Sequence, residues 1–130
     1  MTQPSPRDLP FEVSLYEAVL ARDPSNIEAL TALGEAYTKQ GRHTLGLEVD
    51  QRLARLRPQD PLVRYNLACS LALTGQVDAA FSALSLAVEL GYSDTAHLER
   101  DPDLEALRAD SRFQEVRQRL AARAGAPLKG

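Results

Sequence analysis

Two adjacent stretches of equal length decide the fold: residues 25–58, SNIEALTALGEAYTKQGRHTLGLEVDQRLARLRP, and residues 59–92, QDPLVRYNLACSLALTGQVDAAFSALSLAVELGY. Shifting the sequence by 34 positions places small residues on small residues and turn residues on turn residues. The aligned pairs are Leu33 with Leu67, Gly34 with Ala68, Gly41 with Gly75, Gly46 with Ala80, and Leu47 with Phe81. Self-similarity at a fixed period predicts an internal repeat in which each copy folds as the same small unit.

The first stretch has the signals of two helices joined by a tight turn. Ser25 and Glu28 form an S-x-x-E pattern, which predicts a capping box at the start of a helix. Gly41 predicts the end of that helix, because glycine readily adopts the left-handed conformation that closes helices. We expect a second helix from about His43 until Pro58, where a proline cannot continue the helix.

The second stretch repeats these signals. Asp60 predicts an N-cap, and Pro61 suits the first helical position. We expect this helix to reach Thr74, Gly75 to make the turn, and a partner helix to cover Val77–Leu90. We expect Gly34 to face Gly46 in the first unit, and Ala68 to face Ala80 in the second, so that the backbones of the two helices approach closely.

The composition agrees with helices and excludes several classes of protein. Of the 130 residues, Leu and Ala make up 40, whereas Val and Ile make up only 8. This bias favours an all-α protein over a β-sandwich or a parallel-sheet enzyme. The net charge of −3 predicts no general attraction to nucleic acid or membrane. We expect a cytoplasmic protein, since residues 1–10 lack the pattern of a secretory signal.

No catalytic or metal-binding pattern stands out. His43 and His97 are isolated, and the single Cys69 excludes an internal disulfide or a cysteine zinc site. Asp101 and Asp103 are better explained by the start of a helix than as a catalytic carboxylate pair. The sequence therefore predicts no enzyme, no metal and no cofactor, and Cys69 is interpreted as a core or groove thiol.

The two units resemble tetratricopeptide repeats, a family with this period. The matching positions of the first helix are Leu30, Leu33, Gly34 and Tyr37 in one unit, and Arg64, Leu67, Ala68 and Leu71 in the other. Arg64 departs from the family pattern, which has a bulky apolar residue there, and Asp50 stands where an aromatic residue is usual. Either the local packing is adjusted, or this site is exposed because a neighbouring helix is missing. The resemblance implies a short α-solenoid of antiparallel helix pairs.

The flanking segments complete a predicted domain order. Residues 1–10 are expected to be a disordered tail, and residues 11–24 a half-repeat helix. The two repeats follow at 25–58 and 59–92, and capping helices at 93–124. Gly125 and Pro127 are expected to end the last helix, which leaves 125–130 as a flexible tail. Residues 92–113, YSDTAHLERDPDLEALRADSRF, are similar to tails that follow the last repeat in many bacterial proteins of the family. Solenoids need such a cap because an end repeat exposes its apolar face. The residues expected to cover the helix at 77–90 are Tyr92, Leu98, Leu104, Leu107 and Phe113.

The last helix carries an excess of arginine. Arg112, Arg119 and Arg123 share a helical face, which could bind an acidic partner or a phosphate. The favoured interpretation is a solvated outer face, on which Glu115 pairs with Arg119.

The resemblance also implies a groove, lined by the first helix of each repeat, that binds peptides. Its residues here are Glu28, Thr31, Glu35 and Thr38 in the first unit, and Leu62, Tyr65, Asn66, Cys69, Ala72 and Leu73 in the second. Some of them could instead pack against the tail or a partner subunit. The two glutamates and the apolar side chains of this set favour the binding of a peptide segment that is apolar or mildly basic.

We therefore expect a non-catalytic adaptor or scaffold that binds a protein or peptide, with neither nucleic acid nor membrane as partner. The alternative is self-assembly, such as a homodimer. The half-repeat leaves an open apolar end, and its contact residues would be Phe11, Leu15 and Tyr16.

Overall fold

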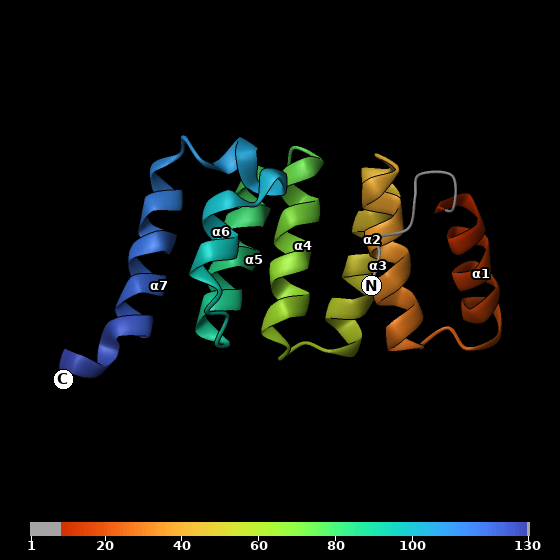
Figure 1. Ribbon diagram of the computed structural model, residues 1–130, viewed down its shortest axis with the longest axis horizontal. Helices are drawn as coiled ribbons and strands as arrows, with labels where there is room; N and C mark the ends of the chain where they lie inside the picture. The colour runs from red at the N-terminus through yellow and green to blue at the C-terminus, as the bar shows by residue number, and fades with distance from the viewer. Residues whose placement is uncertain (1–8, 130) are drawn as a thin grey trace.

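The computed structural model describes the backbone of residues 9–129 and the side chains of residues 10–123. All regular structure in this part of the chain is helical, which confirms the predicted all-α class. The elements are α1 (Leu9–Arg22), α2 (Ile27–Lys39), α3 (His43–Leu56), α4 (Pro61–Leu73), α5 (Val77–Glu89), α6 (Thr95–Arg100), the 3₁₀ helix η2 (Pro102–Leu107) and α7 (Ser111–Lys129). The α-helices follow one another along the long axis, from α1 at one end to α7 at the other, while η2 lies back against α4 (Figure 1).

The pairs α2–α3 and α4–α5 pack closely, as the predicted helix–turn–helix units require. A methyl group added to Gly46 would lie 3.3 Å from the Thr38 hydroxyl and 3.8 Å from the Gly34 carbonyl oxygen. Only a glycine therefore fits without displacing its neighbours. Ala68 and Ala80, at the matching positions of the second pair, are fully buried. The short α-solenoid of antiparallel helix pairs is confirmed.

Most helix boundaries follow the sequence signals. Gly41 and Gly75 have φ angles of 77° and 80°, the left-handed conformation predicted for the turns. Asp60 caps α4 through its side chain, and Pro61 occupies the first helical position. The predicted capping box at the start of α2 is wrong. Asn26 is the N-cap, and its Oδ1 accepts a 2.9 Å hydrogen bond from the amide of Ala29, because its side chain reaches the first turn directly.

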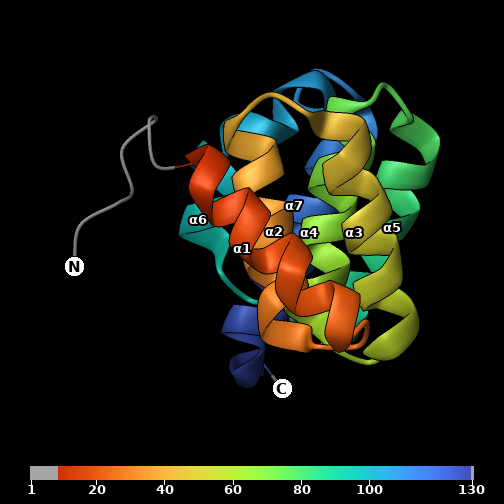
Figure 2. The same cartoon turned by 90° about the vertical axis from the view of Figure 1, so that its right-hand side faces the viewer.

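The cap consists of α6, η2 and α7. All five predicted cap side chains are buried with the apolar residues of α4 and α5 in one core. Asp101 starts η2 as predicted, since its Oδ1 accepts a hydrogen bond from the amide of Asp103. The cap covers more than expected, because η2 packs against α4 while α7 packs against α5. Viewed along the row, α2 and α4 lie between α6 on one side and α3 and α5 on the other (Figure 2).

The ends of the described region differ from the predicted boundaries. The helix α1 starts at Leu9, within the predicted tail, whose residues 1–8 lie outside the described part of the chain. The helix α7 continues to Lys129, past Gly125 and Pro127, at which the sequence predicts its end. Glycine costs only about 1 kcal/mol within a helix, so it does not stop one by itself.

Candidate partner-binding site

The predicted groove residues of α2 are partly exposed. Glu28 and Glu35 are exposed, and Thr31 and Thr38 are half-buried. Both threonine hydroxyls donate to backbone carbonyl oxygens one turn earlier, so their hydrogen-bonding donors are already used. This face therefore offers a partner two free carboxylates and two methyl groups.

The predicted groove residues of α4 are mostly covered. Tyr65, Cys69 and Ala72 are buried, with exposed fractions of 1%, 7% and 4%. The ring of Tyr65 stacks on that of Tyr92, with ring centres 4.3 Å apart. For these residues the structure shows the alternative that the sequence left open, packing against the protein's own tail. Asn66 and Leu73 remain half-buried, and Leu62 is exposed.

Asp101 is the centre of the contact between the cap and α4. Its Oδ2 accepts hydrogen bonds from the Tyr65 hydroxyl at 2.6 Å and the Cys69 thiol at 3.6 Å, and lies 3.0 Å from His97 Nε2. Its other oxygen caps η2, through the amide of Asp103. The sequence reveals the capping role but not this network, because its members are 4 to 36 residues from Asp101.

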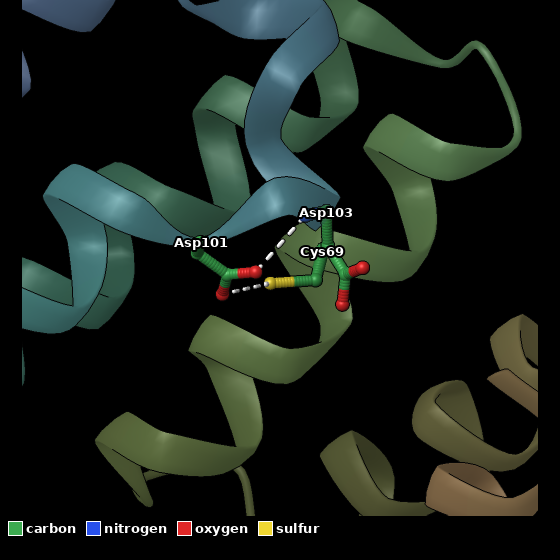
Figure 3. A group of neighbouring side chains, drawn as sticks. All are labelled: Cys69, Asp101 and Asp103. Carbon is green, nitrogen blue, oxygen red and sulfur yellow. Dashed lines mark hydrogen bonds between the residues drawn. The ribbon is translucent and has the colours of Figure 1, made fainter. Parts of the chain in front are cut away.

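The environment of Cys69 keeps its thiol protonated. Burial raises its pKa far above the usual range, and the neighbouring charges of Asp101 and Asp103 add to that shift. The Cys69 sulfur and one carboxylate oxygen from each of the two aspartates lie within 4.8 Å of one another (Figure 3). Such a set could hold a metal ion, which the isolated cysteine in the sequence does not suggest. However, Asp101 already accepts several hydrogen bonds and the thiol resists ionisation, so the arrangement fits a hydrogen-bonded contact better.

A cavity of about 160 Å³ lies where α2 meets the cap. We call it the cap cavity. Its lining residues are Thr31, Gly34 and Glu35 of α2, Asp50 and Leu53 of α3, Asn66 and Cys69 of α4, and His97, Asp101 and Asp103 of the cap. Predicted groove residues from both repeats therefore meet in one place, together with cap residues that the sequence does not connect to them.

Asp50 is a buried carboxylate on the wall of the cap cavity. It is 8% exposed, and its Oδ2 accepts a 2.5 Å hydrogen bond from the hydroxyl of Ser70. Burial raises its pKa to about 7; the Ser70 hydrogen bond lowers it, and the charge of Glu35 raises it further. The family's aromatic position is thus filled by a carboxylate with adjusted packing. Arg64, the other departure, is half-buried and donates to the Pro58 carbonyl oxygen.

The remaining candidates have structural explanations. Arg112 pairs with Asp78 and Asp110, and Arg117 with Glu99. Arg119 pairs with Glu89 rather than with the predicted Glu115, since α5 lies beside α7. The arginine-rich face is therefore largely ion-paired with acidic residues of α5 and of the cap. His43 is half-buried at the start of α3.

On α1, the predicted contact residues are unevenly covered. Phe11 and Leu15 are exposed, whereas Tyr16 packs against the core of α1–α3.

Residues 15–48, from α1 through α2 into α3, match the family model described as tetratricopeptide repeat. Over these residues the chain has the sequence pattern of a tetratricopeptide repeat, in agreement with the resemblance found in the sequence. It is 34% identical over 86 residues to a chloroplastic protein of Arabidopsis thaliana, and 29% identical over 100 residues to the peroxisomal targeting signal receptor of Pichia angusta. These matches cover 64% and 75% of this chain, but only 26% and 17% of those proteins.

A solved structure titled MamA MSR-1 C2 superposes on this chain with a TM-score of 0.62 and 24% sequence identity. The match covers 86% of this chain and 67% of that one. At this identity the likeness concerns the fold alone. Within the described residues, no helix is long and apolar enough to cross a membrane.

Proposed function

We propose that this protein is a non-catalytic adaptor that binds an extended segment of a partner protein on the exposed face of α2. The observation that carries the proposal is the contrast between its two first helices. Most of the α4 face is buried beneath the cap, whereas Glu28 and Glu35 of α2 remain exposed. A repeat fold in which one helix face is exposed is suited to binding a partner rather than to catalysis.

Two further observations support an interaction role. Tetratricopeptide repeats are interaction modules, and one relative is by its name a receptor for a targeting signal. The one thiol in the chain is protonated and buried, so it lacks the ionised state that nucleophilic catalysis requires.

The proposal can be tested by selecting binders from a library of displayed twelve-residue peptides. Thr31→Arg would fill the α2 face, and Gln51→Arg adds the same side chain at an exposed position of α3 as the control. Enriched peptides should bind the wild type and the control equally and lose binding to Thr31→Arg. A failure to enrich peptides, or equal binding by all three proteins, would contradict the proposal.

Self-assembly is the second candidate, and a specific surface favours it. Phe11 and Leu15 of α1 are 70% and 47% exposed, and they lie four residues apart on one helical face. A second copy packing its own α1 there would bury both side chains symmetrically.

Light scattering after size-exclusion chromatography tests this candidate across a range of protein concentrations. A dimer that Phe11→Ser with Leu15→Ser disrupts, and that the exposed control Leu62→Ser leaves intact, would support assembly. A wild-type monomer at every concentration would exclude it.

A further inference from the structure

The cap cavity gathers carboxylates from three parts of the fold. Glu35 comes from α2, Asp50 from α3, and Asp101 and Asp103 from the cap. Among its described lining residues, only His97 can become a cation, and its Nε2 already contacts Asp101. The cavity therefore carries an excess of negative charge that its own walls do not neutralise.

Several of these carboxylate oxygens have no internal donor. Asp50 is more than nine-tenths buried, and only its Oδ2 is hydrogen-bonded, while Oδ1 lies on the Gly34 side of the cavity. Within the described region, no hydrogen bond or ion pair involves the side-chain oxygens of Glu35 or Asp103. The Asn66 amide on the same wall is likewise without a hydrogen bond from the described residues.

Holding like charges together in a partly enclosed space costs free energy, unless a counter-charge enters. Burial raises the pKa of Asp103 and the charge of Asp101 adds to this shift, whereas His43 and His97 oppose it. The pKa of Asp50 is raised as well. A bound cation with several N–H donors would lower the pKa values of both carboxyl groups, because it stabilises their charged forms.

We infer that the cap cavity binds the cationic end of one lysine or arginine side chain, carried by the partner segment that lies along α2. The inference rests on the proposed function and names the chemistry of its partner. The volume of about 160 Å³ suits a single side chain, being smaller than the pockets that hold whole small-molecule ligands. Asp50, Glu35 and Asp103 accept from the cation, and Asn66 pairs with the peptide backbone beside it.

A protein side chain fits this cavity better than a metal ion does. The Cys69 thiol resists ionisation, and Asp101 is engaged by Tyr65, Cys69 and His97. The oxygens that remain free come from separate walls, an arrangement that suits the spread donors of a guanidinium or ammonium group.

The test compares two peptides binding to the full chain at low ionic strength, by calorimetry or by NMR shifts of the Asn66 side chain. The probes are acetyl-Ala-Leu-Ala-Arg-Ala-Leu-Ala-amide and the same peptide with citrulline, the neutral isostere of arginine. The arginine peptide should bind about tenfold more tightly, the effect of one charge-assisted hydrogen bond. Asp50→Asn or Glu35→Gln should each remove about that factor, and the control Glu48→Gln, at an exposed position of α3 outside the cavity, should not.

Equal binding of both peptides, or equal affinity of all variants for the arginine peptide, would overturn the inference. So would an absence of binding by either peptide. In each case the displayed-peptide selection decides separately whether α2 binds partners at all. Thermal unfolding of each variant, followed by circular dichroism, confirms that it remains folded before its affinity is compared.

Discussion

The hydroxyl of Tyr65 donates a 2.6 Å hydrogen bond to Oδ2 of Asp101, across 36 residues of sequence. Both residues are buried, and the bond joins the first helix of the second repeat to the start of η2. It therefore holds the cap over the face of α4 that would otherwise be open to a ligand. In this chain the cap therefore both completes the core and covers much of α4.

Removing this hydroxyl should destabilise the protein measurably. Tyr65→Phe keeps the ring stacked on Tyr92 but takes one donor from a buried carboxylate, a loss of about 1–3 kcal/mol. Urea unfolding measures the change. The matched control is Tyr37→Phe, whose hydroxyl donates to the exposed Glu17, so its loss should be smaller. Equal losses for the two variants would contradict the central role of Asp101.

The thiol of Cys69 should report on opening of the cap. It is 7% exposed with a raised pKa, so we expect the native protein to react slowly with a thiol-specific reagent. Asp101→Asn weakens the cap contact and removes a charge that opposes thiolate formation, so the reaction should become roughly tenfold faster. The control Glu105→Gln changes an exposed carboxylate nearby and should react at the wild-type rate. An unchanged rate for Asp101→Asn would show that Asp101 does not hold the cap closed.

The repeats could be predicted because their signals are local. Gly41, Gly75, Asp60 and Pro61 each act on the backbone within a few residues, so their roles follow from sequence alone. The cap start at Asp101 was predictable for the same reason. The N-cap of α2 was not, because Ser25 and Asn26 are both good caps and the path of the chain selects one.

The site was less predictable because it depends on contacts between distant segments. The resemblance to the family supplied the groove positions but not the fact that η2 lies over Tyr65 and Cys69. In the sequence Asp50 stands out only as a departure from the family pattern, and its place beside the cap residues follows only from the fold.

Replacing the turn glycine Gly75 should lower the free energy of unfolding through backbone strain alone. At Gly75 a Cβ atom would meet no other atom within 4 Å, yet its φ of 80° is strained for most residues. Gly75→Ala should therefore lower the free energy of unfolding by about 1–2 kcal/mol, as measured in urea. Gly75→Asn should lose less, because asparagine tolerates this conformation. An asparagine variant as unstable as the alanine variant would point to another cause.

Asp50 should make stability depend on pH in the direction opposite to that of an ion-paired carboxylate. Its pKa is about 7 in the folded protein and 3.8 for the unperturbed group, so the folded state holds the proton more tightly. The free energy of unfolding should therefore fall as the pH rises from about 4 to 7 and then level off.

Asp50→Asn removes this dependence while keeping an acceptor for the Ser70 hydroxyl. Comparing the two proteins at each pH cancels the contributions of all other groups. Between pH 4 and 8, the free energy of unfolding of the variant should rise relative to that of the wild type by an amount on the order of a few kcal/mol, since each unit of pKa shift is worth about 1.4 kcal/mol. A constant difference between the two proteins over this range would mean that Asp50 is ionised as readily in the folded chain as in the unfolded one.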